Sequence, residues 1–91
     1  MIKPVKTLVE FQKYAGSGIG YVLITDKRRN ERNKIHKSDC RYVTERHFKE
    51  KVVTNAERNG KYFYGDEIEA LVECAKVEAK REVKRCDKCF K

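Results

Sequence analysis

Four residues of types that bind metal ions stand in two pairs far apart in the chain. His36 and Cys40 are separated by three residues and Cys86 and Cys89 by two, while residues 41–85 lie between the pairs. One imidazole and three thiolates match the number and type of ligands that a closed tetrahedral zinc site requires. We therefore predict a structural Zn2+ site formed by His36, Cys40, Cys86 and Cys89, which would attach the end of the chain to its middle.

A site with four protein ligands leaves no coordination position for a reactive water, which argues against catalysis by the metal. The sequence also contains no Ser/His/Asp arrangement and no acidic cluster typical of a nuclease. We therefore expect no catalytic residues and no enzymatic activity.

Other interpretations of these residues stay open. A disulfide scaffold requires an oxidising compartment, but residues 1–6 lack the apolar segment of a signal peptide, so we expect a cytoplasmic protein. A redox C-x-x-C motif begins a helix, whereas Cys86 and Cys89 follow a predicted one. Either His47 or Cys74, both in predicted helices, could replace His36 as a ligand.

Charge is distributed unevenly along the 91 residues, a length that suits a single domain (1–91) with a modest core. Residues 1–65 contain 15 Lys and Arg against 7 Asp and Glu, and residues 66–91 contain 7 of each, so the net charge of +8 lies in the first two-thirds. A basic surface of this kind suits a polyanion such as DNA or RNA. We predict that residues 27–41 form it, with phosphate contacts from Arg28, Arg29, Arg32, Lys34, Lys37 and Arg41.

No segment approaches the ~20 apolar residues that span a bilayer, so we expect no membrane partner. A protein partner and the oligomeric state stay open.

The first elements that must position these residues are predicted from local patterns. Thr7 and Glu10 form a capping box that should begin a short helix, which Gly16 ends. Residues 20–25 and 33–36 should pair as a hairpin, with the basic cluster on its loop and His36 at a strand end.

Later elements are predicted in the same way. Residues 41–50 should form a short helix with Ser38 or Asp39 near its start, and residues 51–54 and 61–64 should be strands. Phe63 is expected in the core, whereas Tyr62 and Tyr64 could either pack there or stack on bases.

The last predicted element is a long helix that Asp66 begins, with an apolar stripe from Ile68 to Val83, and it should carry Cys86 and Cys89 to the site. The predicted fold class is α+β, a small, mainly antiparallel sheet with two to three helices held by a structural zinc site.

The order of these features resembles the zinc-binding domain of the Ada DNA-repair family and the stand-alone Ada-like modules. The matching pieces are residues 35–42, 62–70 and 84–89, so the resemblance covers roughly residues 33–90. It implies a zinc-held fold and, more loosely, DNA contact.

Two departures from the Ada family limit what the resemblance implies. The first ligand of the repair protein is a Cys that accepts a methyl group from a DNA phosphotriester, and His36 stands at that position here. Because an imidazole does not serve as that thiolate nucleophile, methyl transfer is not implied. The segment between Cys40 and Cys86 is also longer than in the family.

We therefore expect a non-enzymatic zinc-binding protein that binds nucleic acid. The main alternative is a zinc-stabilised protein-interaction module or small regulator, which an exposed apolar patch at Val52 and Val53 or over residues 62–64 would favour. An enzyme would instead need a reactive, solvent-open cysteine or a metal with an open coordination position.

Overall fold

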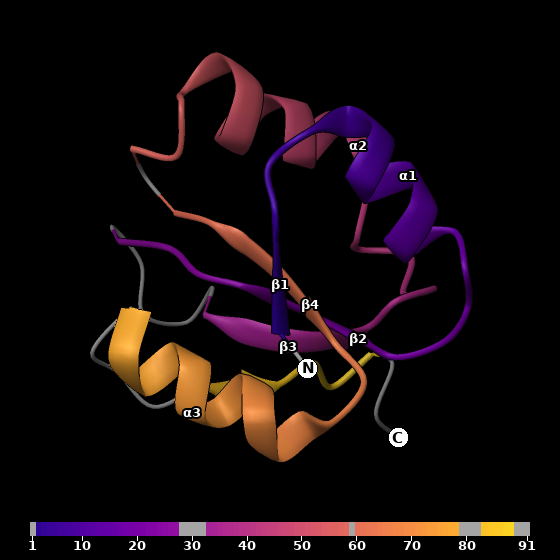
Figure 1. Cartoon of the computed structure of the whole chain (residues 1–91), viewed down its shortest axis with the longest axis vertical. Coiled ribbons are helices and arrows are strands. Elements are labelled where there is room, and N and C mark those ends of the chain that lie inside the picture. Colours follow the sequence, from indigo (N-terminus) through magenta and orange to yellow (C-terminus); the bar gives the residue numbers. More distant parts are fainter. Residues whose placement is uncertain (1, 28–32, 59, 79–82, 89–91) are drawn as a thin grey trace.

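A five-stranded sheet lies between two layers of helices in the computed structural model (Figure 1). The structure describes residues 2–27, 33–58, 60–78 and 83–88. Its elements, in chain order, are β1 (Ile2–Val5), α1 (Leu8–Ala15), β2 (Tyr21–Ile24), β3 (Lys34–Lys37), α2 (Glu45–Phe48), the π-helical segment η2 (Lys49–Thr54), β4 (Tyr62–Gly65), α3 (Ile68–Glu78) and β5 (Lys84–Arg85). The α+β class and the mainly antiparallel sheet are confirmed.

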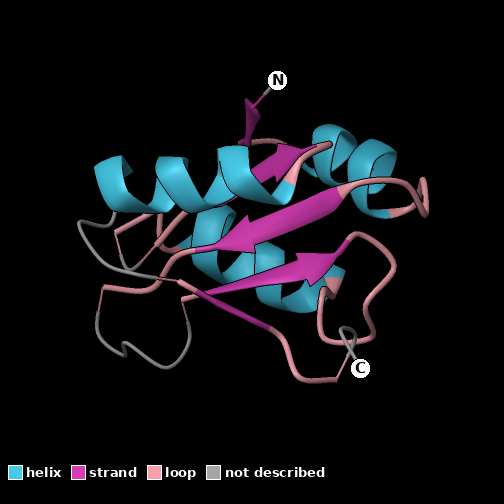
Figure 2. Ribbon diagram, turned by 90° about the horizontal axis from the view of Figure 1, so that it is seen from below, coloured by secondary structure: helices cyan, strands magenta, loops and turns pink. Residues whose placement is uncertain are grey.

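The strand order in the sheet is β1-β4-β2-β3-β5. All neighbouring strands are antiparallel except β3 and β5, which are parallel and place the end of the chain beside its middle (Figure 2). The predicted hairpin is confirmed, because β2 pairs with β3 and Val22 lies opposite His36. Within the described ranges, every helix is too short to span the hydrocarbon core of a bilayer, which requires about 20 residues.

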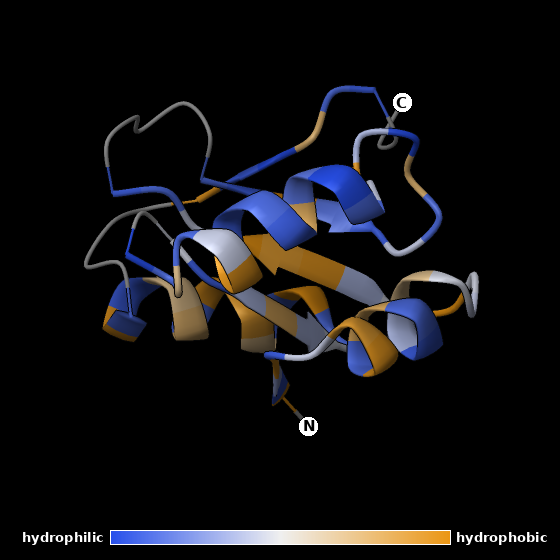
Figure 3. Ribbon diagram, turned by 90° about the horizontal axis from the view of Figure 1, so that it is seen from above, coloured by the Kyte–Doolittle hydropathy of each residue, from blue (hydrophilic) through white to orange (hydrophobic). Residues whose placement is uncertain are grey.

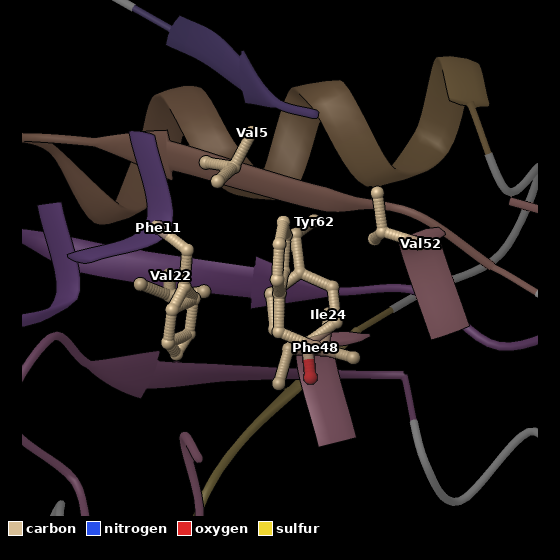
Figure 4. Close-up of a cluster of buried hydrophobic side chains, with 7 residues drawn as sticks. All are labelled: Val5, Phe11, Val22, Ile24, Phe48, Val52 and Tyr62. Carbon is tan, nitrogen blue, oxygen red and sulfur yellow. The ribbon is translucent and has the colours of Figure 1, made fainter. Parts of the chain in front are cut away.

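The first hydrophobic cluster fills the space between the sheet and the layer of α1, α2 and η2 (Figure 4). Phe48 is fully buried and stacks on Phe11 with 4.7 Å between ring centroids, while Tyr62 meets Phe48 edge-on at 5.1 Å. Burial of Tyr62 raises the pKa of its hydroxyl above the ordinary value. The other members of this cluster are Val5, Val22, Ile24 and Val52.

The second hydrophobic cluster lies on the opposite face of the sheet, beneath α3. Phe63 packs there with Leu71 and Ala75 of α3 and with Leu23 and Ile35 of the hairpin. Successive residues of a strand point to opposite faces, which explains why Phe63 and its neighbour Tyr62 belong to different clusters. The core position predicted for Phe63 is confirmed.

The capping box predicted at the start of α1 is confirmed. The Glu10 amide donates to Thr7 Oγ1 at 3.2 Å, and the Thr7 amide donates to the Glu10 carboxylate at 3.1 Å. Gly16 follows the last helical residue, and its amide donates to the Gln12 carbonyl at 3.1 Å.

Residues 51–54 form part of the π-helical η2, so the predicted strand is wrong there. A run of β-branched residues favours a strand, but here only Val52 is buried, whereas Val53 is 58 % exposed. The preceding α2 is capped by Thr44, whose hydroxyl accepts from the His47 amide at 3.3 Å, and not near Ser38 or Asp39 as predicted.

The C-terminal part of the predicted long helix is also wrong. The described helix α3 extends from Ile68 to Glu78, and Lys84–Arg85 is a strand, so β5 and not a helix leads into Cys86. The apolar stripe is correct over α3, where Leu71 and Ala75 are buried. Val83 packs on the same cluster from its position just before β5.

Candidate metal centre

The first ligand pair lies at the end of the central hairpin. His36 is the third residue of β3, and its neighbour across the sheet is Val22. The turn after β3 returns Cys40 toward the strand, because the Cys40 amide donates to the Lys37 carbonyl at 2.9 Å. The Ser38 amide donates to the Gly20 carbonyl at 3.1 Å and holds the turn against the chain before β2.

Cys86 reaches the same place from the end of the chain. β5 runs parallel to β3 with Lys84 opposite Lys34 and Arg85 opposite Ile35. The Cys86 amide extends this pairing by donating to the Ile35 carbonyl at 2.9 Å. The pairing therefore places Cys86 beside His36 at the edge of the sheet.

The ligand atoms of His36, Cys40 and Cys86 all lie within 4.8 Å of one another. All three residues are buried, with 7 %, 6 % and 4 % of their surfaces exposed. With metal–ligand bonds near 2.0–2.3 Å, a tetrahedral zinc site needs ligand atoms about 3.3–3.8 Å apart. Small side-chain adjustments are therefore enough for this group to hold one metal ion.

Two buried polar atoms at the end of β3 and in the turn after it lack a hydrogen-bond partner among the described residues. They are the His36 Nδ1 and the Ser38 Oγ. Buried polar groups are nearly always satisfied in folded proteins. Coordination by His36 would satisfy its imidazole, and a metal-bound thiolate would offer an acceptor of the kind a buried hydroxyl needs. The donor set and the unpaired imidazole nitrogen both fit a metal ion.

Burial, together with the nearby charge of Lys34, lowers the pKa of the His36 imidazole to about 4. The imidazole is therefore neutral at pH 7, and the neutral form is the one that coordinates metals.

The competing ligands lie elsewhere. His47 is exposed on α2, and Cys74 is half-buried on α3, where it packs against the second cluster and burial raises the pKa of its thiol. Neither belongs to the group of His36, Cys40 and Cys86 that could hold a metal ion. Among the described residues, Cys40, Cys74 and Cys86 form no disulfide with one another. Cys89, the predicted fourth ligand, lies outside the described residues.

The predicted phosphate-binding residues are only partly described. Lys37 and Arg41 are exposed on either side of the Cys40 turn, and Lys34 is half-buried on β3. Arg28, Arg29 and Arg32 lie outside the described residues.

Three basic residues that the sequence analysis did not assign to the site, Lys84, Arg85 and Lys88, flank Cys86 and are exposed. No local signal marked them, because the last 26 residues have no net charge and only the pairing of β5 with β3 brings these cations to the site.

The fold and the group of buried ligands define a class: a small α+β protein whose C-terminal strand lies at a His/Cys/Cys centre able to hold a metal ion. Comparisons of the chain with protein-family models, with curated proteins and with solved structures found no match. The likeness to Ada-like modules stays an expectation that rests on residues 33–90.

Proposed function

We propose that this chain is a non-enzymatic protein, stabilised by Zn2+, that binds nucleic acid through the basic surface beside its metal centre. One observation carries the proposal: side chains from the middle and the end of the chain bring three buried ligand atoms within 4.8 Å of one another. A group of this kind, contributed by distant segments, is typical of a structural metal site.

Zinc is the metal that the donor set favours. Thiolate and imidazole are soft or borderline ligands that select zinc among the common structural metals, whereas calcium and magnesium take oxygen ligands. Cys89 follows Cys86 by three residues, a spacing at which both sulfurs reach one ion. We therefore assign Cys89 as the fourth ligand and the site as closed.

The proposed role of the metal is to hold the sheet edge. β5 has only two residues, and both side chains are exposed, so it brings little apolar burial of its own. In sites of this kind the free energy of metal binding is also free energy of folding.

The proposed partner is a nucleic acid because the chain is basic and exposed cations lie next to the metal centre. The chain carries a net charge of +8, and its exposed cations next to the ligands include Lys37 and Arg41. Phosphate contacts of this type give an affinity that falls steeply with salt.

The surface that would favour a protein-interaction module is mostly buried. Val52 and Tyr62 are 6 % and 2 % exposed and belong to the first hydrophobic cluster, whereas Val53 is exposed. The described residues therefore form no continuous apolar patch at the positions that this alternative requires.

Metal stoichiometry and nucleic-acid affinity test the two parts of the proposal separately. Purified protein should contain one zinc per chain by elemental analysis, and His36→Ala and Cys86→Ser should lose it, while the matched control Cys74→Ala should keep it. Fluorescence anisotropy with labelled 20-nucleotide DNA and RNA at 50 mM salt should show binding that weakens at 200 mM. A metal-free wild type would refute the zinc assignment, and no affinity for either probe at low salt would refute the nucleic-acid role.

A further inference from the structure

Cations from two distant parts of the chain surround the metal centre. Lys37 and Arg41 flank Cys40, and the exposed residues Lys84, Arg85 and Lys88 flank Cys86. We call these five residues the metal-centred basic surface. In Figure 3 the segment that leads to the C-terminus is mostly hydrophilic and lies outside the helices.

Cations outnumber carboxylates in the two segments that form this surface. Within residues 33–41 and 83–88, six cations (the five above and Lys34) face two carboxylates, those of Asp39 and Asp87. Both carboxylates are exposed. Residues 33–41 and 83–88 together therefore have a formal net charge of +4, half of the excess of the whole chain.

Strand pairing places two of these cations at opposed positions. Lys84 lies directly opposite Lys34 in the parallel pair of β3 and β5. Neighbouring strands are about 4.8 Å apart, and like charges at opposed positions destabilise the pairing. Binding of a polyanion would remove this repulsion, whereas the repulsion favours separation of β5 when no counter-charge is present.

Backbone hydrogen bonds connect the two halves at both ends of β5. The Lys84 amide donates to the Asn33 carbonyl at 3.4 Å, which is long, and the Cys86 amide donates to the Ile35 carbonyl at 2.9 Å. The ligand groups of Cys86, His36 and Cys40 also lie together across the two halves. A metal ion at these ligands would therefore oppose the electrostatic repulsion between the two halves.

We propose that the metal centre assembles a two-part phosphate-binding surface, in which Lys84, Arg85 and Lys88 act together with Lys37 and Arg41 on one nucleic-acid strand. This inference rests on the proposed function and extends it in two respects. The C-terminal cations, and not only residues 27–41, contact phosphates. Metal loading and nucleic-acid affinity rise together, because each favours the paired arrangement of β3 and β5.

Neutralising the C-terminal half tests the proposal without removing a ligand. The variant Lys84→Gln/Arg85→Gln/Lys88→Gln is compared with the control Lys13→Gln/Lys49→Gln/Lys76→Gln, which removes three exposed positive charges from α1, η2 and α3. Both variants are first checked for zinc content and circular dichroism. Affinity for a labelled single-stranded 20-mer is then measured from 50 to 300 mM salt.

The C-terminal variant should bind about 10- to 100-fold more weakly than the control, and the slope of log K against log salt should fall by about 2, as expected for the loss of three phosphate contacts on a single strand. Chelating the zinc should weaken nucleic-acid binding by the control much more than binding by the C-terminal variant. The C-terminal variant already lacks the three cations, Lys84, Arg85 and Lys88, that the metal would hold in place.

Each other outcome has a defined meaning. Absence of binding by the wild type would refute the proposed function itself, and this inference with it. Binding by the wild type with equal affinity and slope in the two variants would refute only the two-part surface. Polyglutamate binding as tight as that of the 20-mer, with the same loss in the C-terminal variant, would overturn nucleic acid as the partner and indicate an acidic protein.

Discussion

Removal of zinc is expected to release residues 83–88 from the sheet edge and to lower the stability of the whole protein. Ordering the backbone of six residues costs about 1–2 kcal/mol each, or roughly 6–12 kcal/mol. Against this, backbone hydrogen bonds such as that from the Cys86 amide to the Ile35 carbonyl contribute only about 1 kcal/mol each. Cys86 is buried and Val83 is partly buried, and coordination of a metal ion by Cys86 would add to these contributions.

The size of the expected effect follows from mass action. At free zinc 1,000-fold above Kd, the metal stabilises the folded state by about 4 kcal/mol. For a domain of this length each kcal/mol shifts the melting temperature by about 4–8 °C. Chelation should therefore lower the melting temperature by roughly 16–32 °C, and the release of β5 should appear first as faster hydrogen exchange at the Cys86 amide.

The assay compares melting by circular dichroism and amide exchange, each with zinc and with a chelator. The Cys74→Ala variant is the control, because it removes a half-buried thiol outside the centre and should respond to chelation like the wild type. Equal melting temperatures and equal exchange at Cys86 with and without metal would refute the structural role.

Three further predictions concern the core, the hairpin and the basic surface. Phe48→Ala should cost about 3–5 kcal/mol in urea unfolding, because a fully buried ring between two aromatic neighbours is lost, and a change below 1 kcal/mol would contradict this packing. Lys51→Met should lower the free energy of unfolding by about 3 kcal/mol, because it leaves the buried carboxylate of Asp26 without this cation. The Lys51 amine donates to the Thr25 carbonyl at 3.0 Å and pairs with Asp26 at 3.2 Å. Unchanged stability would show that the pair contributes nothing. Tyr42→Ala should weaken single-strand binding by about 1–3 kcal/mol in anisotropy, since Tyr42 is 44 % exposed beside Arg41, whereas Tyr42→Phe should bind normally; equal binding by the Ala variant would exclude base stacking there.

Elements with a strong local pattern were predicted correctly from the sequence. The capping box of Thr7 and Glu10 depends on residues three positions apart, and the hairpin depends on two short segments that are close in the chain. In the same way, the alternation in β4 placed Phe63 in the core, and the structure puts Tyr62 in the core of the opposite face. Short-range chemistry is enough to determine these elements.

The strand prediction for residues 51–54 is wrong because tertiary contacts override the local pattern there. Residues 51–54 contain two valines and a threonine, but the segment continues the helical path of α2 so that Val52 packs inward and the Lys51 amine reaches Asp26. The contact of Lys51 cannot be read from the segment alone, because Asp26 is 25 residues away in the chain.

β5 could not be predicted because its two residues carry no strand signal. Lys84 and Arg85 are both charged and exposed, and a helical continuation of the preceding stripe accounts equally well for Val83. The H-x3-C and C-x-x-C spacings did predict that this part of the chain meets the end of β3, and three of those four residues do come together in the structure. The ligand spacing therefore carried long-range information that the hydrophobic pattern of the same segment lacks.

The ligands can also specify the register of β5. In the observed pairing Ile35 lies opposite Arg85, so the alternation of strands places His36 and Cys86 on one face and Ile35 and Arg85 on the other. A shift by one residue would move the Cys86 thiol to the α3 face, away from His36. With two charged residues in the strand, hydrophobic burial of β5 side chains provides no penalty against such a shift. Coordination of one ion by His36, Cys40 and Cys86 does provide it, so a metal at this centre would select one register of a strand that is otherwise weakly specified.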